Sequence, residues 1–128
     1  MRVSWFIALT ALTLACGGGD SGGTQPPPPP PTTATVTTPG QTFSPDSVRI
    51  AAGGTVTWNI DGLHNVVFVN ATPFAGNTSA RSGNPGALTT VTGTFPTAGT
   101  YLYYCEPHGF GSTNPPSVSG MSGKVVVE

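Results

Sequence analysis

Short stretches rich in valine, threonine and aromatic residues recur along the chain from about residue 34, with glycine and proline in the gaps between them. They lie at residues 34–37, 48–50, 55–59, 64–69, 88–95, 101–105 and 124–127. Most of them alternate apolar with polar residues, which is typical of a half-buried β-strand, and no stretch has a convincing helical period. The sequence therefore predicts an all-β domain in which about seven short strands form a two-sheet β-sandwich.

The composition of the 128-residue chain restricts its size class and its partners. Charged residues make up 7% of the chain and the net charge is -1, so there is no basic patch with which to bind nucleic acid. Two cysteines are too few for a disulfide framework. The composition fits one small domain, which needs an efficient core, and Val56, Trp58 and Phe68 are the residues expected to form it.

Residues 1–16 have the pattern of a secretion signal. Arg2 gives a positive end, and the apolar run that follows is too short to cross a bilayer as a helix. Cys16 lies where bacterial lipoproteins carry their lipidated cysteine, although Thr13 replaces the usual leucine and Leu12 stands one place too early. We therefore expect export to the periplasm or cell envelope and a lipid anchor on Cys16, and a plain cleaved signal is the alternative.

Residues 17–32 read as a linker between this segment and the domain at residues 33–128. The linker begins with glycines and ends in six prolines, Pro26 to Pro31. Glycine-rich chain is flexible, whereas a proline run is a semi-rigid spacer of about 3 Å per residue. Such a linker is suited to holding a domain away from a membrane.

An aromatic stretch, residues 101–104, leads directly to Cys105, and His108 follows three positions later. Pro107 and Gly109 are turn residues, so we expect the strand to end near Cys105 and His108 to lie on the loop beyond it. A thiolate and an imidazole at this spacing can point at one metal ion. The alternative is a buried free cysteine beside a surface histidine, because free cysteine behaves as a small hydrophobe.

Four residues of the domain have side chains suited to a copper site: His64, Cys105, His108 and Met121. Beyond residue 32 the chain contains no other histidine, cysteine or methionine. Two imidazoles and one thiolate in a plane, with a weak axial thioether, form the blue-copper electron-transfer arrangement. The thiolate binds both oxidation states, the imidazoles suit Cu(I) and Cu(II), and the thioether tunes the potential. Three or four protein ligands leave no open position for a substrate, which argues against an enzyme.

Several alternatives remain open for these residues. Zinc accepts one cysteine and two histidines, Cys105 could pair with Cys16 in an oxidising compartment, and Met121 could be core filler. A copper delivery protein without an electron-transfer role would use the same ligands. A metal-free, immunoglobulin-like interaction domain would use none of them.

Five segments of the domain together resemble cupredoxins of the plastocyanin type. They are residues 42–50, 53–58, 63–68, 98–109 and 120–127. The resemblance implies a Greek-key β-sandwich of about seven to eight strands, one type 1 copper ion, and a monomeric electron carrier that meets redox partner proteins. It implies His64 as the upstream ligand and a hydrogen bond from the Asn65 backbone amide to the ligand sulfur.

One spacing departs from that family pattern. Plastocyanin-like loops place the methionine five residues after the second histidine, whereas Met121 lies thirteen residues after His108. We expect residues 110–120 to form a loop that bulges outward beside His108 and adds partner contacts. Gly120 and Gly123 bracket Met121 and a valine-rich strand follows, as in the family, so we retain Met121 as the axial ligand.

Overall fold

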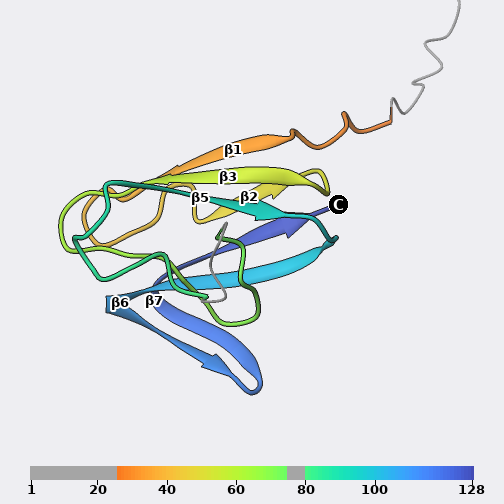
Figure 1. Cartoon of the computed structure of the whole chain (residues 1–128). Coiled ribbons are helices and arrows are strands. Elements are labelled where there is room, and N and C mark those ends of the chain that lie inside the picture. The colour runs from red at the N-terminus through yellow and green to blue at the C-terminus, as the bar shows by residue number, and fades with distance from the viewer. Residues whose placement is uncertain (1–25, 75–79) are drawn as a thin grey trace, which may run out of the picture.

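A computed structural model describes residues 26–74 and 80–128. The strands are β1 (Thr33–Thr37), β2 (Ser47–Ile50), β3 (Gly54–Asn59), β4 (Val67–Phe68), β5 (Thr90–Phe95), β6 (Gly99–Thr113) and β7 (Pro116–Val127). They form a three-stranded sheet in the order β1-β3-β5 and a four-stranded sheet in the order β2-β7-β6-β4 (Figure 1). The expected all-β sandwich is thus confirmed. Nowhere in these two ranges is there a helix long and apolar enough to cross a membrane.

The core lies where inward-facing residues of the two sheets meet. In β3, Val56 and Trp58 are fully buried, and Phe68 of β4 is 3% exposed, so the three expected core residues are confirmed. Trp58 is central, with its ring centroid 5.8 Å from that of Phe68 and 5.4 Å from that of Tyr103, both in edge-to-face geometry. Such aromatic pairs add about 0.5–1.5 kcal/mol each beyond their burial. The packing makes a rigid frame for the residues at the strand ends.

The N-terminal segments are only partly described. The expected signal at residues 1–16, including Cys16, and residues 17–25 of the expected linker lie outside the described residues. The carbonyl of Pro31 accepts a hydrogen bond from the Ala51 amide at 2.8 Å, and that of Thr32 accepts one from the Thr55 amide at 3.0 Å. The chain is therefore held to the sandwich from Pro31 onward, just before β1.

The expected strand at residues 64–69 is shorter in the structure, where only Val67 and Phe68 are paired in β4. The adjacent segment at residues 80–82 accounts for the difference. It supplies Ser82 Oγ as acceptor to the Val66 amide at 3.0 Å and the Ala80 carbonyl as acceptor to the Phe68 amide at 2.9 Å. These bonds satisfy the backbone of residues 66–68 without a continuous strand partner.

The long region between Cys105 and the last strand differs most from expectation. The prediction that the strand ends near Cys105 and that residues 110–120 form a loop was wrong. β6 continues to Thr113 and pairs with β7 from Gly109↔Gly120 to Thr113↔Pro116. This hairpin extension, residues 109–120, projects below the sandwich in Figure 1 and is called the arm. The arm is rich in glycine, serine and proline and has few large apolar side chains. Its sequence therefore lacks the alternation of apolar and polar residues that is typical of a half-buried strand.

The hydroxyl group of Tyr103 lies in an unusual environment, which makes the free energy of unfolding depend on pH. The residue is fully buried and its hydroxyl has no hydrogen-bond partner in the described structure. Burial raises the pKa of Tyr103 to about 12, and Asp46 adds to the rise. The indole N–H of Trp58 is close enough to oppose part of this rise in pKa, but it is not in hydrogen-bonding geometry.

We therefore expect the free energy of unfolding to fall as the pH rises from about 10 to about 12. In this interval the unfolded chain loses the Tyr103 proton while the folded chain keeps it, which costs roughly 2 to 3 kcal/mol in total. Urea unfolding across this range measures the effect. Tyr103→Phe should remove this decline. Tyr101→Phe is the control and should keep it, because Tyr103 stays fully buried in that variant. Equal alkaline profiles for Tyr103→Phe and the unmutated chain would contradict the prediction.

Candidate metal centre

A wide bulge in the β6–β7 ladder forms the candidate centre. Tyr104 pairs with Ser122 and Gly109 pairs with Gly120, so residues 105–108 lie opposite the single residue Met121. Bulges redirect side chains and are common beside functional sites. Strand pairing thus places Met121 across from the Cys105–His108 segment, although thirteen positions separate it from His108.

Cys105 and His108 face one another within this bulge. Cys105 is a fully buried free cysteine, His108 is half-buried, and Cys105 Sγ lies 3.7 Å from His108 Nδ1. Bonds of about 2.3 Å to sulfur and about 2.0 Å to nitrogen, the lengths typical of protein-bound zinc, place two donors about 3.5 to 3.8 Å apart at angles of about 110 to 120°. The pair therefore has the separation that one shared metal ion requires.

His64 reaches the same place from the segment before β4. Its ring centroid lies 4.9 Å from that of His108, and the residue is 7% exposed. Its Nδ1 is buried without a hydrogen-bond partner, and Asp61 Oδ1 is 3.6 Å away, beyond hydrogen-bonding distance. The Asp61 carboxylate instead accepts a hydrogen bond from Thr38 Oγ1. A buried, unpartnered imidazole nitrogen is costly, and a metal ligand bond would satisfy it.

The three strong donors are connected through His108, which neighbours both Cys105 and His64. Among the residues that the structure describes, no three His, Cys, Asp or Glu side chains form a closed cluster around one point. The donor chemistry and the free Nδ1 of His64 nevertheless fit a soft metal ion bound between two imidazoles and a thiolate.

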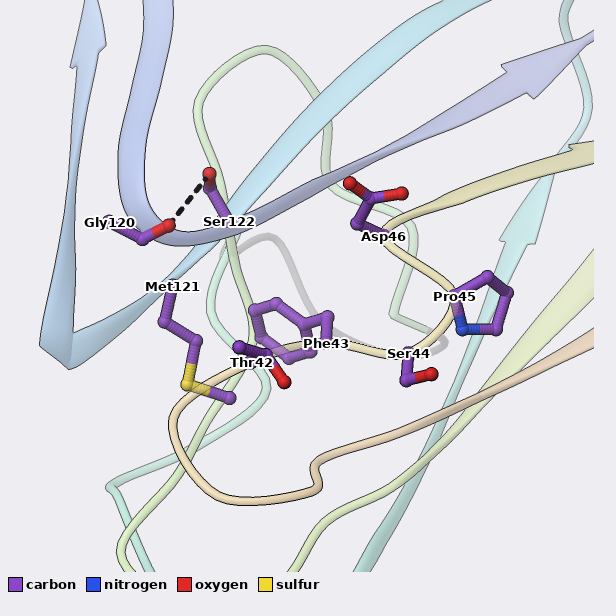
Figure 2. Close-up of a pocket in the computed structure, with 8 residues that line it drawn as sticks. All are labelled: Thr42, Phe43, Ser44, Pro45, Asp46, Gly120, Met121 and Ser122. Carbon is purple, nitrogen blue, oxygen red and sulfur yellow. Dashed lines mark hydrogen bonds between the residues drawn. The ribbon is translucent and has the colours of Figure 1, made fainter.

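Met121 is 2% exposed and lines a surface pocket of about 480 Å³. Figure 2 shows its thioether extending from β7 toward Thr42 and Phe43. A side chain added at Gly109 would lie 2.7 Å from the Met121 carbonyl oxygen, so the two strands approach closely here. The structure thus brings Met121 to the edge of the centre, and its role as axial ligand stays a prediction.

The side chain of Asn65 makes contacts that the sequence does not predict. Its side-chain Nδ2 donates to Glu106 Oε2 at 2.7 Å, and its Oδ1 accepts from the Glu106 backbone amide at 3.0 Å. Arg81 donates to the same carboxylate from Nε at 2.8 Å. One feature of the sequence points toward this contact. Only 7% of the residues are charged, and one of them, Glu106, stands directly after the candidate ligand Cys105. The bond from the Asn65 backbone amide to the sulfur stays a prediction.

The sandwich and these candidate donors fit the class of copper-binding β-sandwich proteins. Comparison with known proteins agrees, because the sequence profile of copper binding proteins of the plastocyanin/azurin family matches residues 32–128. The chain therefore belongs to the plastocyanin/azurin family of cupredoxins, which bind one type 1 copper ion and whose members are electron-transfer proteins.

Individual relatives support the family assignment. The chain is 39% identical over 94 residues to plastocyanin of Scenedesmus fuscus, covering 67% of this chain and 86% of that protein. It is 40% identical over 94 residues to the chloroplastic plastocyanin of Tetradesmus obliquus, covering 67% of this chain but only 58% of the relative's length. A solved structure of an oxidized amicyanin variant superposes with a TM-score of 0.54 at 30% identity, covering 75% of this chain and 82% of that one.

Proposed function

We propose that this chain is an electron carrier that holds one type 1 copper ion between His64, Cys105 and His108, with Met121 as a weak axial ligand. The observation that carries the proposal is the close pair of donors, Cys105 Sγ 3.7 Å from His108 Nδ1, beside the unpartnered Nδ1 of His64. Copper bound there supplies a one-electron couple between Cu(II) and Cu(I).

The protein's contribution is to hold the donors in place and to exclude water. Cys105 is fully buried and His64 is 7% exposed, while the half-buried His108 is the donor nearest to solvent. Cys105 directly follows Tyr104, which pairs with Val67 of β4 on one side and with Ser122 of β7 on the other, so the start of the Cys105 segment is held in place in both oxidation states. A site closed by protein donors leaves no position for a substrate, which supports a carrier rather than an enzyme.

Adding Cu(II) to the purified domain tests this proposal. An electron carrier of this type should develop an intense blue thiolate-to-copper band and should undergo reversible one-electron reduction. A copper delivery protein would share the ligands but lose copper rapidly to a competing chelator, so the dissociation rate separates the two functions. A colourless protein after copper addition would overturn the proposal.

Met121→Gln tests the axial position. An amide oxygen is a harder donor than a thioether and favours Cu(II), so we expect a coloured centre with a lower reduction potential. Each tenfold change in the relative stability of the two oxidation states shifts the potential by about 59 mV for one electron. Voltammetry measures the shift. Met121→Leu is the control, since it removes the donor without adding oxygen and should not lower the potential. If neither variant changes spectrum or potential, Met121 is core filler.

The surface near His108 is suited to brief contact with redox partner proteins. Leu63 is 70% exposed and Phe110 is 68% exposed, and residues 107–123 contain no charged side chain. Redox encounters use small interfaces. Leu63→Glu should slow electron exchange with a partner and between copies several-fold without bleaching the copper, as stopped-flow measurements would show. Thr35→Glu adds the same charge on β1, which belongs to the three-stranded sheet, whereas His108 belongs to β6 of the four-stranded sheet. This variant should leave the rates unchanged. Equal rates for both variants would argue against this surface.

We also propose that the protein acts outside the cytoplasm, held at a membrane by a lipid on Cys16 and spaced from it by the glycine- and proline-rich linker. Support comes from the sequence of residues 1–32 alone. The mass of the mature native chain tests it, because lipidation adds acyl groups to a chain that begins at Cys16. A mature chain that begins there without lipid would exclude the anchor.

A further inference from the structure

We propose that Arg81 and Glu106 are positioning residues that hold the Cys105 segment against the His64 segment before copper binds. The inference rests on the proposed function only for the identity of the metal. The contact between the two segments belongs to the metal-free protein, where it can be tested separately.

The two segments that carry ligands are joined through the residues next to those ligands. Asn65 follows His64 and Glu106 follows Cys105. Asn65 Nδ2 donates to Glu106 Oε2 at 2.7 Å, and the Glu106 amide donates to Asn65 Oδ1 at 3.0 Å. The two residues therefore exchange two hydrogen bonds. Asn65 is only 1% exposed, so separating it from Glu106 would leave a buried side-chain amide without these partners, which is costly.

Arg81 holds the Glu106 carboxylate in the orientation that this exchange needs. Its Nε donates to Glu106 Oε2 at 2.8 Å, and its Nη2 forms a further close contact to the same oxygen. One oxygen thus accepts from both the guanidinium and the Asn65 amide. Charge-assisted bonds of this kind are stronger and more directional than neutral ones.

The backbone around Arg81 is itself attached to the His64 segment. The Ser82 amide donates to the Val66 carbonyl at 2.9 Å, and the Phe68 amide donates to the Ala80 carbonyl at 2.9 Å. Asn65 Nδ2 also donates to the Gly83 carbonyl at 3.1 Å. Residues 80–83 therefore form a strap beside residues 65–68, and the Arg81 side chain reaches from this strap to Glu106.

A second arginine–glutamate pair provides a matched control. Arg49 of β2 contacts Glu128 at 2.5 Å, and the exposed side-chain fractions are 52% and 44%, compared with 42% and 32% for Arg81 and Glu106. Partly exposed pairs of this kind contribute little to global stability, so both arginine variants should fold. Only the Arg81 pair includes a residue next to a candidate ligand, because Glu106 follows Cys105, so only its loss should affect the centre.

Hydrogen exchange of the Glu106 backbone amide in the metal-free protein is the first test. This amide donates to Asn65 Oδ1, so its exchange rate reports opening between the two ligand segments. Arg81→Met should accelerate the exchange roughly tenfold, Arg81→Lys should accelerate it less because the charge remains, and Arg49→Met should leave it unchanged. An unchanged rate in Arg81→Met, or equal acceleration in both methionine variants, would overturn the proposal.

Copper affinity, measured by competition with a chelator, is the second test. Loss of a group that orients a ligand typically weakens metal binding by about 10- to 100-fold. We expect such a loss for Arg81→Met, partial recovery for Arg81→Lys and no loss for Arg49→Met. Equal affinity of Arg81→Met and the unmutated protein would overturn the positioning role. An unmutated protein that binds no copper would instead overturn the proposed function, and the exchange measurement would still decide whether Arg81 joins the two segments.

Discussion

A Cys105→Ser variant should fold and show no blue band after Cu(II) is added. Cys105 is the only soft anionic donor at the centre, and the intense band requires charge transfer from a thiolate to copper. A serine hydroxyl stays protonated at neutral pH and is a poor copper ligand, so the two imidazoles alone would bind Cu(II) weakly and almost without colour. Visible absorption after titration with Cu(II) measures the result.

Folding of the variant can be separated from loss of the centre. Cys105 is fully buried, and an unsatisfied buried hydroxyl costs about 1–3 kcal/mol, which a sandwich packed around Trp58 should tolerate. Circular dichroism and urea unfolding would show this. Cys16→Ser is the matched control, since it removes the other cysteine of the chain and should retain the full band. A band that survives in Cys105→Ser, or disappears in Cys16→Ser, would refute the assignment of the ligand.

The sandwich could be predicted because its inward residues repeat at the period of a strand. Val56 and Trp58 stand two positions apart in β3, and both are fully buried. The candidate ligands could be predicted because metal-binding side chains are rare in the domain. His64 and His108 are its only histidines, and Cys105 is its only cysteine. Both inferences used local chemistry and needed no knowledge of how distant strands pair.

The arm could not be predicted by the same reasoning. Residues 109–113 and 116–120 pair with each other but contain only two large apolar residues, Phe110 and Val118, so no half-buried pattern marks them as strands. The closeness of Met121 to the centre depends on the pairing of Gly109 with Gly120, a long-range register that spacing along the chain does not reveal. For this reason the separation of thirteen residues between His108 and Met121 predicts, from the sequence alone, a long loop.

The contact between Arg81 and Glu106 was missed for a related reason. The two residues are twenty-five positions apart, and they meet only because residues 80–82 run beside residues 66–68. Between the expected strands at residues 64–69 and 88–95 the sequence has no strand pattern, and it does not show which strand this part of the chain runs beside. Long-range side-chain contacts of this kind require the tertiary arrangement.

Gly120→Ala should be strongly destabilising, because two separate constraints act on this residue. Its φ is +69°, in the left-handed region that costs other residues about 1–2 kcal/mol. An added Cβ would also lie 2.6 Å from the His108 carbonyl oxygen and 3.0 Å from Gly109 Cα. These atoms lie where strand pairing resumes after the bulge, so relief requires the strands to separate beside His108.

Gly40→Ala separates the two constraints. Gly40 has a φ of +62°, and a Cβ added there meets nothing within 4 Å. We expect a loss of about 1 kcal/mol at Gly40 and of about 3 kcal/mol or more at Gly120, where the usual cost of about 1–3 kcal/mol for overpacking is added to the backbone strain. The entropy that alanine removes from the unfolded chain is the same at both sites and cancels in the comparison.

Urea unfolding of the metal-free variants measures the stability difference, and the blue band of the copper-loaded variants reports on the centre. Gly120→Ala should shift or weaken the band, because the movement it forces passes to His108 on one strand and Met121 on the other. Gly40→Ala should leave the band unchanged. Equal losses of stability in the two variants, with both bands intact, would mean that Gly109 and Gly120 do not close the bulge, and the approach of Met121 to His108 would then lose its structural basis.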